Sequence, residues 1–103
     1  MEKAKRFSSE YTMLSIIEYL CLYSRKTPIS KYHIMTKISE IKQQRPDRIS
    51  LILNKLEQNG YLKSIDTPNA KFYLITEKGF DAYLKWIKDF LIFVRSIYNE
   101  NTN

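Results

Sequence analysis

Residues 49–79 read ISLILNKLEQNGYLKSIDTPNAKFYLITEKG, and this stretch decides the fold. Its first part carries apolar side chains at helical spacing: Ile49, Ile52, Leu53 and Leu56. Asn59 and Gly60 follow as a strong stop, because both residue types tolerate the left-handed conformation at a helix C-terminus. Pro46 has the fixed φ that suits a first helical turn. The spacing therefore predicts a helix over about 45–58.

After Gly60 the pattern becomes typical of strands. Residues 61–65 and 71–75 are rich in aromatic and β-branched side chains, and residues 66–70 between them, DTPNA, are turn formers. Two such runs predict a β-hairpin over about 61–75. A lone hairpin is barely stable in water, so it must pack on the helices. Thr76 is the expected N-cap of the last helix.

Two more helices are expected upstream. The first spans about 9–23 and begins at Ser9, with an inner face predicted at Met13, Leu14, Ile17, Leu20 and Cys21. Pro28 disfavours helix at the residue before it, so the link after the first helix is extended. Ser30 then caps a short second helix, whose predicted buried side is Ile34, Met35 and Ile38.

The last quarter of the chain is one long amphipathic helix, predicted over 77–98. Its apolar residues repeat every seven positions for three repeats. At 1.5 Å per residue the helix is ~33 Å long, and about half of that length covers a three-helix core. The distal half would leave a large apolar patch on a monomer. We therefore predict a homodimer interface at Ile87, Phe90, Leu91, Val94, Ile97 and Tyr98. The sequence does not decide between parallel and antiparallel pairing.

The 103 residues suit one domain, mainly α with a small β-hairpin (α+β). The expected order is helix, helix, helix, hairpin, long helix. A polar turn of about six residues with one apolar anchor, Ile41, joins the second helix to the third, which is a helix-turn-helix spacing.

The positive charge lies in the first part of the chain. Residues 1–63 hold twelve Lys/Arg and six Asp/Glu, a balance of +6, whereas residues 64–103 hold five of each. A basic front and a neutral, apolar-striped rear indicate a polyanion partner and a second copy of the chain. With one His and one Cys, the chain carries no recognisable catalytic set, so no enzyme activity, metal or cofactor is expected. Cys21 is either a small buried residue or a cross-link between two copies.

Two motifs carry a family resemblance: Leu-Glu-x-x-Gly-Tyr-Leu at 56–62 and Leu-Ile-Thr-Glu-Lys-Gly at 74–79. Their pairing resembles winged helix-turn-helix proteins, among them small regulators of archaea and their viruses, small crenarchaeal chromatin proteins, and PadR-like and MarR-like repressors. The resemblance covers roughly residues 9–98, and the expected organisation is a basic arm (1–8), a winged helix (9–76), a dimerisation helix (77–98) and a tail (99–103). The resemblance implies that the third helix enters the major groove and that the hairpin touches the backbone or minor groove.

Residue chemistry then suggests individual roles. The side chains predicted to read bases are Gln43, Gln44, Arg45, Arg48 and Asn54. Those predicted to position the protein on the phosphate backbone are Lys31, Tyr32, Lys37, Lys42, Ser50, Lys55, Asn69 and Lys71. Asp47 is awkward near phosphate, and we assign it to the helix dipole or to an ion pair with an Arg. Lys3, Lys5 and Arg6 could follow a groove as a flexible arm.

The resulting hypothesis is a homodimeric, sequence-specific double-stranded DNA-binding transcription regulator with a pseudo-palindromic target. One alternative is an architectural chromatin protein with weak sequence preference. Another is a winged-helix protein-interaction adaptor whose basic face is incidental. No targeting signal or membrane-spanning run is recognisable, so a cytoplasmic location and no membrane partner are expected.

Overall fold

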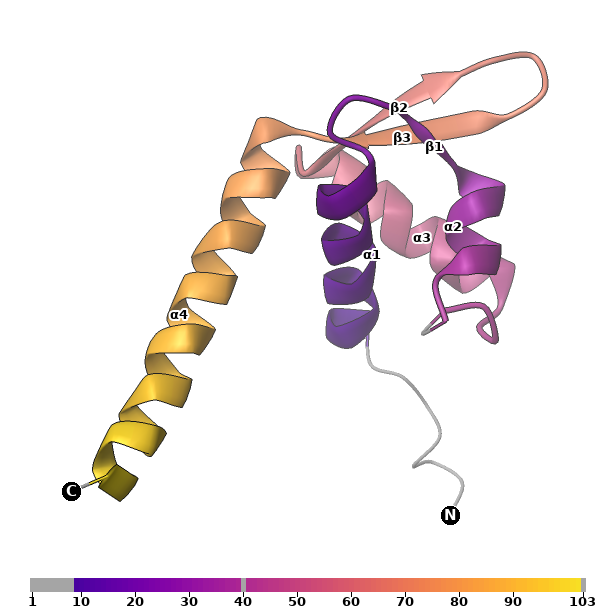
Figure 1. Ribbon diagram of the computed structural model, residues 1–103. Helices are drawn as coiled ribbons and strands as arrows, with labels where there is room; N and C mark the ends of the chain where they lie inside the picture. Colours follow the sequence, from indigo (N-terminus) through magenta and orange to yellow (C-terminus); the bar gives the residue numbers. More distant parts are fainter. Residues whose placement is uncertain (1–8, 40, 103) are drawn as a thin grey trace.

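The computed structural model describes residues 9–39 and 41–102. Its elements are α1 (Ser9–Tyr23), β1 (Ile29–Ser30), α2 (Lys31–Lys37), α3 (Pro46–Gln58), β2 (Leu62–Asp66), β3 (Lys71–Ile75) and α4 (Glu77–Thr102). Helices α1, α2 and α3 form the body under the sheet, while the β2–β3 hairpin and α4 leave the body in opposite directions (Figure 1). This is the predicted α+β winged-helix order. The basic arm, Lys3, Lys5 and Arg6 included, lies outside the described residues.

The sheet has one strand more than predicted. β2 and β3 pair antiparallel from Leu62 opposite Ile75 to Asp66 opposite Lys71, and β1 adds to the other edge of β3. The sequence indicated only an extended link here. A strand of two residues carries no periodic signal of its own, and it forms because β3 lies beside it.

The core joins all three body helices to the sheet. Its fully buried members include Ile16, Leu20, Ile34, Ile41, Ile49, Leu53 and Tyr73. The predicted stripes of the second and third helices and the anchor Ile41 lie at this core. The predicted inner face of α1 was partly wrong, because Thr12 and Ile16 are buried in place of Leu14. α1 is turned so that Met13, Leu14 and Ile17 flank the core on the side that meets α4.

The end of α3 follows the predicted stop at Gly60, which has a positive φ of 84°. The amide of Tyr61 donates to the Leu56 carbonyl at 2.9 Å, and that of Gly60 donates to the Glu57 carbonyl at 3.0 Å. These two bonds form a Schellman ending, which turns the chain directly into β2. Asn59 itself has a negative φ.

The start of α4 is fixed on the body by Thr76 and Gly79. The Thr76 hydroxyl accepts from the Gly79 amide at 3.0 Å and donates to the Gly60 carbonyl at 2.6 Å, so the predicted cap also ties α4 to the end of α3. A Cβ at position 79 would overlap the Tyr61 carbonyl oxygen. Only glycine therefore allows this close approach of α4 to the chain before β2.

α4 continues to Thr102, so the predicted tail at 99–103 was wrong as far as it is described. The apolar repeat ends at Tyr98, but residues 99–102 contain neither Gly nor Pro to end the helix.

Candidate nucleic-acid interface

The outward face of α3 is polar. Its buried side chains, Ile49, Ile52, Leu53 and Leu56, hold the helix on the core. On the opposite side the exposed residues are Asp47, Leu51, Asn54, Lys55 and Gln58. Asn54 and Lys55 were predicted to contact DNA, whereas Leu51 and Gln58 were not. A polar, convex helix face of this kind can enter a major groove.

The N-terminal end of α3 presents Arg45. Its side chain is 82% exposed and forms an ion pair with Asp47 at 3.2 Å. The same carboxylate accepts from the Arg48 amide at 2.9 Å, inside the first turn of the helix. Asp47 thus has both of the roles considered for it, at the positive end of the helix dipole and beside an arginine.

Gln44 and Arg48 are held by the protein rather than extended into solvent. Gln44 Nε2 donates to Thr12 Oγ1 at 3.1 Å, and Gln44 Oε1 accepts from Arg48 Nε at 2.8 Å. Both side chains are half-buried, whereas Gln43 in the preceding turn is exposed. The chain Thr12–Gln44–Arg48 fixes the start of α3 against α1 and orients the Arg48 guanidinium. For Gln44 to read a base as predicted, its side-chain amide would have to exchange these two hydrogen bonds for bonds to DNA.

The predicted phosphate-contacting residues divide by exposure. Tyr32, Lys37, Lys42, Lys55 and Asn69 are exposed, whereas Lys31, Ser50 and Lys71 are half-buried. They come from α2, the turn after it, α3 and the hairpin. Lys63 on β2 is also exposed and was not predicted to contact DNA. Side chains alternate between the two faces of a strand, so the buried Leu62 places its neighbour Lys63 on the exposed face.

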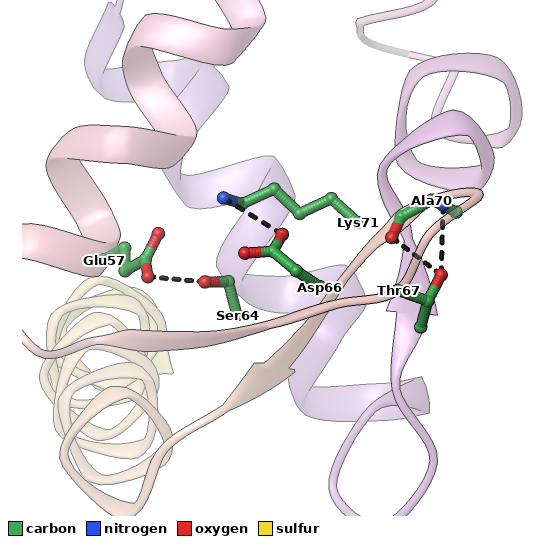
Figure 2. Close-up of polar contacts among 6 residues, drawn as sticks. All are labelled: Glu57, Ser64, Asp66, Thr67, Ala70 and Lys71. Carbon is green, nitrogen blue, oxygen red and sulfur yellow. Dashed lines mark hydrogen bonds and ion pairs between the residues drawn. The ribbon is translucent and has the colours of Figure 1, made fainter.

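One polar contact couples the hairpin, or wing, to α3, and further polar contacts lie within the wing (Figure 2). Ser64 Oγ on β2 donates to Glu57 Oε2 on α3 at 2.6 Å. Farther along the wing, Lys71 Nζ lies 3.4 Å from Asp66 Oδ1 across the last strand pair. The Thr67 side chain and the Ala70 backbone close the turn with two bonds of 3.0 Å. The wing is therefore held in a defined position relative to α3, and the charge of Lys71 is partly offset.

α4 packs on the body only near its start. Phe80 and Tyr83 contact the core, with the Arg25 guanidinium 3.8 Å from the Phe80 ring centre. The Tyr83 hydroxyl donates to Glu18 on α1 at 3.2 Å. Burial, and then the Glu18 carboxylate, raise the pKa of Tyr83 above its ordinary value. Between α1 and α4 lies an apolar groove of about 210 Å³, lined in part by Leu14 and Trp86.

Beyond that groove the apolar stripe of α4 is open. Phe90, Leu91, Ile97 and Tyr98 are 44–65% exposed, and Ile87 and Val94 on the same stripe are half-buried. Rings of Trp86 and Phe90 stack at 5.5 Å with an interplanar angle of 6°, and Phe93 continues the row. Trp86 and Phe93 were not in the predicted dimer set, although helical spacing places them along one edge of the stripe.

Within the described residues, no helix is both long and apolar enough to cross a membrane. The same residues contain no group of three His, Cys, Asp or Glu side chains arranged to hold a metal ion.

Comparison with solved structures finds a similar fold in several transcription regulators. MepR, a transcription regulator of the Staphylococcus aureus multidrug efflux pump MepA, superposes with a TM-score of 0.72 at 13% identity, over 86% of this chain and 63% of that one. The chain thus spans less than two thirds of that MepR chain. MepR in a complex with DNA gives a TM-score of 0.70 at 13% identity, over 88% of this chain and 72% of the other.

A PadR family transcription regulator from Clostridium difficile R20291 matches with a TM-score of 0.62 at 20% identity, over 90% of this chain and 99% of that one. Neither a model of a known protein family nor a curated protein matches the sequence. At these identities the likeness establishes a shared winged-helix fold. The predicted resemblance to PadR-like proteins is confirmed at that level.

Proposed function

We propose that the chain is a double-stranded DNA-binding transcription regulator that acts as a homodimer. The observation that carries the proposal is the outward face of α3. Its buried side fixes the helix on the core, and its exposed side and N-terminal end offer Arg45, Asn54 and Lys55 beside a wing of defined position. A major groove accepts one such helix, and the wing then reaches the neighbouring backbone.

Charge supports the same surface. Residues 31–63 carry seven Lys/Arg and three Asp/Glu, and they coincide with α2, the turn, α3 and the start of the wing. Cations at these positions would displace counterions from DNA, which makes binding favourable and salt-dependent. The solved structure of MepR bound to DNA provides a precedent for this fold on a duplex.

The open stripe of α4 supports the homodimer. Several aromatic and aliphatic side chains lie about half-exposed along one helix face, which is the arrangement that a second copy of the same helix covers best. A two-fold dimer places two copies of α3 about one helical turn of DNA apart, ~34 Å, so we expect a pseudo-palindromic target.

The decisive experiment is selection of bound fragments from random duplex DNA, followed by fluorescence anisotropy with the selected and a scrambled duplex over a range of salt. We expect an enriched two-fold symmetric sequence, bound at least ~10³-fold more tightly than the scrambled duplex. A ratio near one, with strong salt dependence, would favour the architectural chromatin protein. No binding to any duplex at low salt would favour the protein-interaction adaptor.

A further inference from the structure

Leu51 is the one large apolar side chain on the outward face of α3 among the described residues, and it is 56% exposed. It lies off the buried stripe of Ile49, Ile52, Leu53 and Leu56 by helical spacing. The residues four before, three after and four after it share its face and are polar and exposed: Asp47, Asn54 and Lys55. Leu51 is therefore an isolated apolar group in the centre of a polar face, and not the margin of the core.

A single exposed leucine is ordinary on a protein surface, so exposure alone gives Leu51 no role. Its place on α3 is what distinguishes it. In the major groove the base edges offer hydrogen-bond donors and acceptors, with one apolar feature, the 5-methyl group of thymine. An aliphatic side chain in the middle of a groove-facing helix matches that methyl group and satisfies none of the polar edges.

We propose that Leu51 determines specificity by contacting the 5-methyl group of a thymine in each half-site. The inference rests on the proposed function, and it assigns one residue of the DNA-binding surface to one base. Arg48 lies three residues before Leu51 and Asn54 three residues after it, a separation of ~4.5 Å along the helix axis on each side. That distance is close to one base-pair step of ~3.4 Å, so polar readers would contact the base pairs that flank the thymine.

The test removes the methyl group from DNA rather than only the side chain from the protein. In the selected duplex each thymine is replaced in turn by deoxyuridine, which differs by that methyl alone. For the parent protein we expect one position per half-site where the substitution weakens binding about fourfold, the equivalent of one buried methylene group. With Leu51→Ala, binding to the thymine duplex should fall, and the difference between thymine and deoxyuridine at that position should vanish.

A matched control is Leu22→Ala, because Leu22 on α1 is a leucine of similar exposure, 65%. This variant should keep the full preference for thymine. Both leucines are mostly exposed, so thermal unfolding by circular dichroism should match the parent for both variants and exclude misfolding as the cause.

The outcomes separate the inference from the function on which it rests. If a sequence is selected but no thymine shows a methyl effect that depends on Leu51, the inference is wrong and the regulator stands. If duplexes bind without any sequence preference, the inference is wrong and the architectural chromatin protein replaces the regulator, although DNA binding remains. If no duplex binds, the proposed function fails as well.

Discussion

α3 and α4 are both amphipathic helices with apolar residues at the same period, yet only α3 places its whole stripe on the body. α3 has 13 residues and spans ~20 Å, which the core covers from Ile49 to Leu56. α4 has 26 residues and spans ~39 Å, and contacts the core only through its first turns. The long helix leaves the body at the side opposite to the wing (Figure 1).

The difference shows what an apolar period does and does not determine. It identifies the face that must be covered in both helices. It does not identify the surface against which that face packs. For α3 this surface is the chain's own core, and for distal α4 we propose that it is a second copy of the chain. The length of a helix relative to the body decides between these outcomes.

The largest effect is expected from a pair of leucines, one in each stripe. Leu53→Ala removes a fully buried side chain from α3 and should lower the free energy of unfolding by ~2–5 kcal/mol at every protein concentration. Leu91→Ala in α4, at a side chain 44% exposed, should destabilise only at concentrations where dimers form. Urea unfolding at two concentrations a hundredfold apart measures both. An equal loss for Leu91→Ala in dilute solution would place distal α4 in the monomer core.

The second prediction concerns charge in the open stripe. Phe90→Asp combined with Val94→Asp should weaken dimerisation by at least ~100-fold, because the dimer would bury unpaired carboxylates. Light scattering over a concentration series gives the mass. Ile92→Asp is the matched control, since residue 92 is 56% exposed but lies ~200° around the helix from residue 90. Dimers that persist in the double variant would move the interface elsewhere.

The features that were predicted correctly depend on residues near one another in the chain. The stripe of α3 follows from helical spacing alone, and the bonds of the turn at Gly60 and of the Thr76 cap join residues within about five positions, so local chemistry specifies all three. The wing was predicted for the same reason, because its two strands are adjacent in sequence and joined by turn formers.

The features that were missed depend on distant partners or on an ambiguous pattern. β1 exists because Ile29 and Ser30 lie beside β3, more than forty residues away. Gln44 was predicted as a base reader, and nothing local reveals that its amide reaches Thr12, 32 residues earlier. In α1, apolar residues at 13, 14, 16 and 17 occupy several sides of the helix, so the period did not select the buried face.

A third prediction tests the N-terminal end of α3. Arg48→Ala should cost ~1–3 kcal/mol on the selected duplex and relax preference at one base pair. The hydrogen bond that Arg48 Nε donates to Gln44 Oε1 orients this guanidinium, so Gln44→Ala should give a smaller effect in the same direction. Anisotropy with duplexes mutated one base pair at a time is the measurement. Equal losses on selected and scrambled DNA would reassign Arg48 to the backbone.

A fourth prediction contrasts the wing with α4. Lys71→Ala should weaken binding to all duplexes several-fold and reduce the slope of log affinity against log salt by roughly one. Asp66→Asn should strengthen binding to all duplexes, because it releases Lys71 from its ion pair. Lys88→Ala, on the exposed side of α4, should change neither quantity. A salt slope altered by Lys88→Ala would extend the DNA-binding surface to the long helix.

The smallest effect concerns Cys21, which is 6% exposed in the core. Burial raises the pKa of its thiol from 9.0 to about 11, so the folded body should resist iodoacetamide at pH 8. A cysteine introduced by Ile92→Cys in a Cys21→Ala background should react freely, since residue 92 is exposed on α4. Rapid alkylation of Cys21 in the folded protein would show instead that this part of the body opens easily.

The raised pKa of Cys21 also makes the free energy of unfolding depend on pH. Only the unfolded chain forms the thiolate readily, so the contribution of Cys21 to stability is fully present below pH 9 and is lost as the pH rises toward 11. Cys21→Ala should remove that part of the decline.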